Sequence, residues 1–116
     1  MEFENGQSIY NQIADNLSDK IINEEFKPGE KIPSVRELAA EVGVNPNTIM
    51  RTYTELQSKG IIENKRGIGY FVQSEAPLRI LEERKRNFFE RILPQFIKEA
   101  SQLGISPEEL KKHLNL

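Results

Sequence analysis

The chain has 116 residues, 29% of them charged and 37% hydrophobic, and a formal net charge of −2 at pH 7. This length accommodates one compact domain with a short appendage and is too short for a barrel or a doubly wound nucleotide-binding enzyme. The sequence has no cysteine and one histidine, which excludes disulfides and thiolate-bound zinc and leaves too few imidazoles for a histidine metal site or a catalytic triad.

Apolar residues spaced four apart predict an amphipathic helix over about residues 8–24: Ile9, Ile13, Leu17 and Ile21. Ser8 precedes this stripe, and its hydroxyl can cap the first turn. Pro28 and Gly29 then impose a turn. Residues 31–33 are expected to form a short extended segment.

Two short helices with a brief turn between them are predicted next. Ser34 and Glu37 have the spacing of a capping box, which starts a two-turn helix that Gly43 ends. Asn45 can cap the following helix, and Pro46 occupies its first position, where a missing N–H costs nothing. Two such helices joined by a short glycine-containing turn make a helix-turn-helix.

The second of these helices has two chemically different faces. At 100° per residue, Ile49, Tyr53 and Leu56 share one side, which we expect to be buried. The opposite side carries short hydrogen-bonding side chains and an arginine: Asn47, Arg51, Thr54 and Ser58. Arginine can bind guanine, asparagine can bind adenine, and Thr48 can reach a phosphate. The alternative is an ordinary polar surface, since any outward helix face is polar.

Beyond these helices the hydrophobic period changes from 3.6 to 2, which predicts a β-hairpin with strands at residues 61–64 and 70–72. Its connection is basic and flexible and is typical of a wing tip that contacts a DNA backbone or minor groove: Lys65, Arg66, Gly67 and Gly69. An ordinary basic hairpin loop is the alternative. This order of elements predicts a winged helix-turn-helix, a mainly α fold with a small β-hairpin.

Arg36 lies at the second position of the first short helix, whose N-terminus points its amides outward. Together they suit one phosphate. The alternative is a solvated surface arginine beside a capping glutamate.

We expect a DNA-binding domain over residues 1–75 and a helical tail over residues 76–116. The tail carries an apolar stripe that is too rich for one small monomer to cover: Leu81, Phe88, Phe89, Ile92 and Phe96. This stripe predicts a homodimer interface of paired or exchanged helices, unless it packs back on its own winged helix. Pro94 removes the hydrogen bond to the Glu90 carbonyl, so a kink or break is expected near residues 91–94.

Several segments resemble the GntR family of bacterial transcription regulators: Ile-Pro-Ser-Val-Arg-Glu-Leu-Ala at 32–39, Gly-Val-Asn-Pro-Asn-Thr at 43–48, and Arg-Gly-Ile-Gly-Tyr-Phe-Val at 66–72. The Val-Asn-Pro-Asn-Thr run and the short tail are similar to its YtrA subfamily. The resemblance implies a homodimeric repressor that binds a palindromic operator in double-stranded DNA. It also implies DNA contacts at the matching positions: Ser34, Arg36, Asn45, Asn47, Thr48, Arg51, Arg66, Gly67 and Gly69.

Two other functions stay open at this point. The net charge of −4 over residues 1–33, from three basic and seven acidic side chains, and the isoelectric point near 5.5 favour a winged-helix module that binds proteins. The second open function is that of a regulator with a small-molecule site in the dimer interface, although the sequence identifies no effector. No apolar run approaches the roughly 18 residues of a membrane span, and the first ten residues do not resemble a signal peptide. We therefore expect a cytoplasmic protein with no catalytic residue, metal, cofactor or membrane partner.

Overall fold

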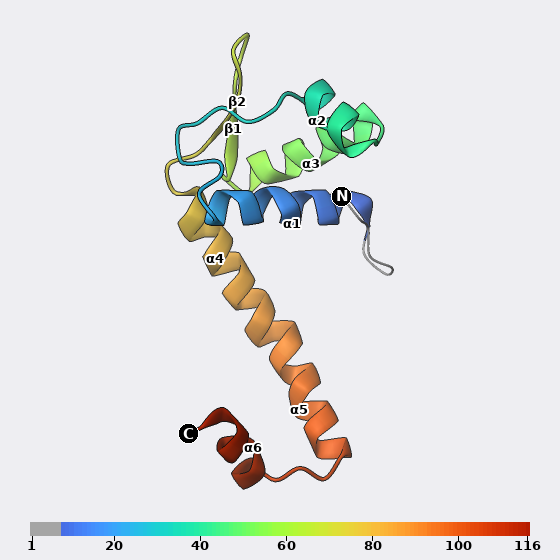
Figure 1. The fold of residues 1–116 in the computed structure, drawn as a ribbon, viewed down its shortest axis with the longest axis vertical. Helices are drawn as coiled ribbons and strands as arrows, with labels where there is room; N and C mark the ends of the chain where they lie inside the picture. Colours follow the sequence, from blue (N-terminus) through green and yellow to red (C-terminus); the bar gives the residue numbers. More distant parts are fainter. Residues whose placement is uncertain (1–7) are drawn as a thin grey trace. The chain divides into compact units, whose positions relative to one another are not determined.

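The computed structural model describes residues 8–116, in which three short helices and a hairpin precede further helices (Figure 1). In chain order the elements are α1 (Ile9–Ile22), α2 (Val35–Val42), α3 (Pro46–Ser58), β1 (Ile62–Lys65), β2 (Gly69–Val72), α4 (Ala76–Asn87), the π-helical turn η1 (Phe88–Ile92), α5 (Leu93–Gln102) and α6 (Pro107–Leu114). The chain divides into two compact units between Leu81 and Glu82. This arrangement confirms the predicted mainly α fold with one small antiparallel hairpin.

Local side-chain caps determine where α2 and α3 begin. The Ser34 hydroxyl accepts a hydrogen bond from the Glu37 amide at 3.1 Å, and the Glu37 carboxylate accepts one from the Ser34 amide at 3.1 Å. Gly43 ends α2 in the left-handed conformation, with φ of 79°, which glycine adopts without steric cost. The Asn45 side chain accepts the Asn47 amide at 2.8 Å and starts α3. The capping box and both helix starts that the sequence predicts are confirmed.

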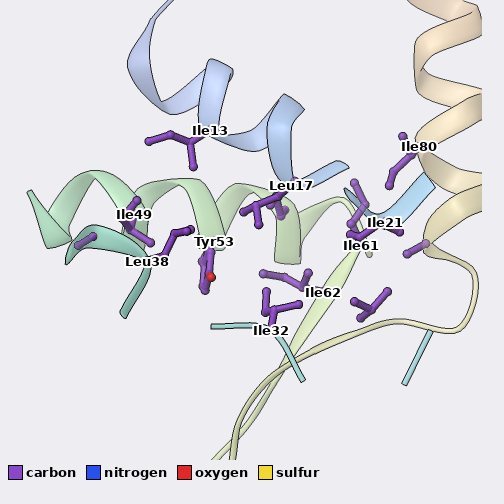
Figure 2. Close-up of a cluster of buried hydrophobic side chains, with 14 residues drawn as sticks. Ile13, Leu17, Ile21, Ile32, Leu38, Ile49, Tyr53, Ile61, Ile62 and Ile80 are labelled. Carbon is purple, nitrogen blue, oxygen red and sulfur yellow. The ribbon is translucent and has the colours of Figure 1, made fainter. Parts of the chain in front are cut away.

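The core of the first unit lies where α1 crosses α3. Ile13 and Leu17 of α1 point toward α3, and Tyr53 on α3 is completely buried (Figure 2). At the other end of the cluster, Ile80 of α4 packs beside Ile21 and Ile61. Each of these aliphatic side chains contributes on the order of 1.5–3 kcal/mol by leaving water, so the first turns of α4 are part of this core.

The hairpin projects from the three helices (Figure 1), and its register runs from Ile62 opposite Val72 to Lys65 opposite Gly69. The expected strand at residues 61–64 is therefore shifted by one position. Lys65 and Gly69 form the last pair of the ladder, so the connection is residues 66–68 only. The turn is tighter than expected because the Ile68 amide donates to the Lys65 carbonyl at 2.8 Å.

An isolated bridge joins the segment before α2 to this two-stranded sheet. Lys31 forms an antiparallel bridge with Phe71, and the Ile32 amide donates to the Tyr70 carbonyl at 2.9 Å. The segment that the sequence predicts as extended thereby pairs with the open edge of β2. This pairing anchors the chain that leads into α2 to the wing.

Helical backbone continues from residue 76 to residue 102. A kink or break was expected near residues 91–94; the chain does not break there, and the α-helix is interrupted by a π-helical turn in which the Leu93 amide donates to the Phe88 carbonyl. A wider turn just before Pro94 gives room to a proline ring that would otherwise clash with a preceding carbonyl. None of the helices that the structure describes combines the length and the hydropathy needed to traverse a bilayer.

Candidate nucleic-acid interface

Helix α3 has a buried face and an exposed face, as its sequence pattern predicts. Ile49 and Tyr53 are 0% exposed and Leu56 is 2% exposed. On the opposite side Asn47 and Arg51 are exposed, together with Thr54 and Ser58. The helix therefore presents hydrogen-bonding side chains to solvent from a support that is fixed by the core.

The exposed side chains keep specific hydrogen-bonding capacity. The Thr54 hydroxyl donates to the Met50 carbonyl at 2.8 Å, which leaves its oxygen as an acceptor for an amino group of a base. The Asn45 oxygen is occupied by the Asn47 amide, so the NH₂ group of Asn45 is its outward donor and suits a phosphate. Thr48, which is half-buried, is the least accessible of the predicted contacts on α3.

The exposed face of α3 is bordered by a different element on each side. On one side the Arg51 guanidinium carbon lies 4.3 Å from the ring centroid of Tyr10 in α1. On the other side the hydroxyl of Tyr70, in β2, lies 3.9 Å from the Met50 sulfur. Sequence reasoning missed Tyr10, because nothing local indicates that residue 10 lies beside residue 51.

Tyr53 fixes α3 to both of its neighbours. Its hydroxyl donates to the Pro33 carbonyl at 2.6 Å, just before α2 begins. Its ring meets the Tyr70 ring edge-on, with centroids 4.8 Å apart and planes at 71°. Burial raises the pKa of the Tyr53 phenol far above its ordinary value, so this donor stays protonated at any physiological pH.

The N-terminus of α2 carries two of the predicted phosphate contacts. Ser34 is half-buried in the capping box and Arg36 is exposed. The backbone and side-chain hydrogen bonds from Ser34 lower the pKa of Glu37, with a smaller lowering from the charge of Lys31. Arg36 makes no ion pair with any residue from 8 to 116, so its charge is available to a phosphate.

The wing presents Lys65 and Arg66 to solvent. The Lys65 ammonium lies 3.8 Å from a Glu63 carboxylate oxygen and 4.4 Å from the Phe71 ring centroid, whereas Arg66 occupies the turn itself. Gly67 adopts φ of 78° there, a conformation that a side chain would strain.

Lys31 adds a third cation to the wing that sequence reasoning did not single out. A Cβ on Gly69 would lie 2.7 Å from the Lys31 Cε, so the lysine side chain covers this glycine closely. Since Lys31 pairs with Phe71 and directly opposed residues share a face of a sheet, Lys31, Lys65 and Phe71 lie on the same face of the wing. Only the bridge between the two segments reveals this cluster.

The apolar stripe of the tail is solvent-exposed. Its members are between 44% and 62% exposed: Leu81, Phe88, Phe89, Ile92 and Phe96. The rings of Phe88 and Phe89 meet edge-on with centroids 5.3 Å apart. A shallow depression on η1 and α5 lies among part of the stripe and is lined by Arg91, Ile92, Gln95, Phe96 and Glu99.

Comparison with known proteins places this architecture in a family. Residues 9–72 match the bacterial regulatory proteins of the gntR family. The chain is 41% identical to the HTH-type transcriptional regulator YhcF of Bacillus subtilis over 109 residues, which cover 94% of this chain and 88% of YhcF. It is 38% identical to the HTH-type transcriptional repressor YtrA of the same organism over 102 residues, which cover 88% of this chain and 78% of YtrA.

A solved structure agrees over almost the full length. A GntR-family transcriptional regulator from Bacteroides thetaiotaomicron superposes with a TM-score of 0.81 at 42% identity, covering 93% of this chain and 94% of that one. The agreement extends beyond the winged helix into the helical tail. This chain therefore belongs to the GntR family, is YtrA-like within it, and is a DNA-binding helix-turn-helix transcriptional regulator.

Proposed function

We propose that this regulator is a homodimeric repressor that binds a palindromic operator with one α3 helix in the major groove of each half-site. The observation that carries the proposal is the exposed row of Asn47, Arg51 and Thr54 opposite the buried face of α3. Short polar side chains and an arginine on a rigidly packed helix are what direct recognition of base edges requires. The relative YtrA is named as a repressor, which supports the same direction of regulation here.

Each predicted residue has a role in this proposal, and that of Thr54 is to accept a hydrogen bond from an amino group of a base. Arg51 binds guanine O6 and N7, and Asn47 binds the edge of an adenine. Contacts that position the protein on phosphates come from the two helix starts, through Ser34, Arg36, Asn45 and Thr48. The wing contacts the backbone or minor groove through Lys65, Arg66 and the backbone at Gly67 and Gly69.

The exposed stripe of the tail supports a dimer. An aromatic side chain such as Phe89 is 62% exposed, and contiguous apolar surface of this kind marks an interaction site. A second copy of the chain is the proposed partner, because a two-fold interface buries the same stripe from both protomers. Two recognition helices held about 34 Å apart then match half-sites one helical turn apart.

Selection of bound sequences from a random duplex library, followed by affinity measurements at several salt concentrations, tests the proposal. A palindromic consensus with half-sites about one turn apart is the expected result. If a folded dimer enriches no sequence at low salt, the proposal fails and a winged-helix module that binds proteins becomes the better explanation.

Two substitutions separate base contacts from phosphate contacts on the selected duplex. Arg51→Ala is expected to cost about 1–3 kcal/mol and to relax the preference at one base position. Arg36→Ala is expected to weaken binding to all DNA sequences alike. It should also lower by about one the slope of log affinity against log salt concentration. Lys59→Ala is the control, because Lys59 lies at the C-terminal end of α3, 3.6 Å from Glu55; a loss there equal to that of Arg51→Ala would indicate bulk charge alone.

A further inference from the structure

The side chain of Tyr10 supports the guanidinium of Arg51. The ring, which is half-buried on α1, lies 4.3 Å below the guanidinium carbon of the exposed arginine. Both residues line a shallow depression between α1 and α3, together with Thr54, Glu55 and Ser58. A cation over an aromatic face is attracted by the ring quadrupole, so this contact determines where the arginine rests in the free protein.

Without the ring, Arg51 has another partner within reach. Glu55 lies four residues further along α3 and borders the same depression, and oppositely charged residues at this spacing attract each other. In the structure Glu55 instead lies 3.6 Å from the Lys59 ammonium, and Arg51 makes no ion pair with any residue from 8 to 116. With Arg51 over the Tyr10 ring, its N–H groups make no ion pair with a carboxylate in residues 8–116, whereas pairing with Glu55 would occupy them.

The position of the ring is itself held by α3. The Thr52 hydroxyl, completely buried on α3, lies 3.5 Å from the Tyr10 carbonyl oxygen and 2.9 Å from the Thr48 carbonyl oxygen. One turn further along α1, Ile13 is 1% exposed in the core. Backbone and core contacts thus fix Tyr10 relative to the recognition helix, and a fixed aromatic platform is what positions a flexible arginine.

We propose that Tyr10 is a positioning residue that holds the Arg51 guanidinium in the orientation in which it binds a guanine edge. Tyr10 acts through Arg51. This inference rests on the proposed contact between Arg51 and the operator. It predicts that the effect of changing Tyr10 depends on the presence of Arg51.

The test uses the full chain, the selected consensus duplex and an unrelated duplex of equal length. Tyr10→Phe keeps the ring face and is expected to bind the consensus as the wild type does. Tyr10→Leu keeps apolar volume but loses the ring, and its affinity for the consensus is expected to fall about two- to fivefold, with a weaker preference at the base position that Arg51→Ala relaxes. Affinity for the unrelated duplex is expected to stay the same, and thermal unfolding confirms that each variant folds.

The double variant separates the positioning role of Tyr10 from the base contact of Arg51. In an Arg51→Ala background, Tyr10→Leu is expected to have no further effect on consensus affinity. An equal loss in both backgrounds overturns the positioning role and shows that Tyr10 acts independently of the arginine. If Arg51→Ala alone leaves consensus affinity unchanged, the proposed base contact of Arg51 is wrong, and the positioning role falls with it.

A measurement on the free protein tests the stack without any DNA. Protons of the Arg51 side chain over an aromatic face are expected to resonate upfield in the NMR spectrum. The shift should persist in Tyr10→Phe and disappear in Tyr10→Leu. Its absence from the wild type overturns the inference whatever the operator measurements show.

Discussion

Replacing Tyr53 with phenylalanine isolates one buried hydrogen bond of the recognition helix. The substitution removes only the hydroxyl, which donates to the Pro33 carbonyl at 2.6 Å from a side chain that is 0% exposed. The ring and its edge-on contact with Tyr70 are retained. Because only the donor is removed, the loss is the penalty for a buried acceptor left without its partner, about 1–3 kcal/mol. Because Pro33 is only half-buried, we expect the lower part of this range, about 1–2 kcal/mol.

Tyr70→Phe is the matched control, since it removes the same atom from the neighbouring ring. Among residues 8–116, the hydrogen-bond partner of the Tyr70 hydroxyl is the Met50 sulfur, at 3.9 Å, and sulfur is a weak acceptor. Tyr70 is also half-exposed, so water can replace the lost contact. We therefore expect a change in the free energy of unfolding of less than about 0.5 kcal/mol.

Urea unfolding of the wild type and both variants, at one protein concentration, measures the difference. With a slope of about 2 kcal/mol/M, Tyr53→Phe should lower the midpoint by about 0.5–1 M and leave the slope unchanged. Equal midpoints for the two variants would refute the argument. That outcome would mean that the Pro33 carbonyl finds water once the hydroxyl is gone.

Three further predictions concern titration, capping and assembly. Because burial raises the pKa of Tyr53 above its ordinary value of 10.0, wild-type stability should fall above about pH 10 by up to about 1.4 kcal/mol per pH unit; Tyr53→Phe should flatten this decline in alkaline urea titrations. Ser34→Ala should cost about 1 kcal/mol of stability. The backbone hydrogen bond from Ser34 and then its side chain lower the pKa of Glu37, so this stabilisation is present above the ordinary carboxyl pKa and is lost as pH falls through the lowered one. Ser34→Ala removes only the side-chain part, and its loss of stability in acid should be smaller than that of the wild type but still present; a loss larger than that of the wild type would contradict this. Phe89→Glu should yield monomers by sedimentation where Phe89→Leu stays dimeric, and a dimeric Phe89→Glu would exclude the stripe as the interface.

Local sequence signals were sufficient to predict where α2 and α3 begin. The Ser34–Glu37 box and the Asn45–Pro46 start act through hydrogen bonds between residues two or three positions apart, so they need no knowledge of the rest of the fold. The assignment of Ile49 and Tyr53 to the buried face is equally local, because helical periodicity alone separates the two sides.

Structural features that depend on contacts between distant segments were missed or only partly predicted. The hairpin strands were expected at residues 61–64 and 70–72 and form at Ile62–Lys65 and Gly69–Val72, because the basic stretch around Lys65 and Arg66 does not show which residues form the final pair. Lys31 was expected only in an extended segment, yet its bridge to Phe71 brings it to the wing. Pro94 predicts an interruption of the helix, but whether the chain breaks or widens into a π-turn depends on how the surrounding turns accommodate the ring.

The sequence by itself therefore determined the order of elements, the family, and the side of α3 that faces solvent, because caps and periodicity act within a few residues. Only the tertiary structure decided what those exposed side chains touch. Arg51 rests on Tyr10 because α1 crosses α3 at that point, and Tyr53 binds Pro33 because the chain entering α2 passes beneath it. Contacts between residues twenty or forty positions apart arise from packing of the whole core, which no local pattern in the sequence encodes.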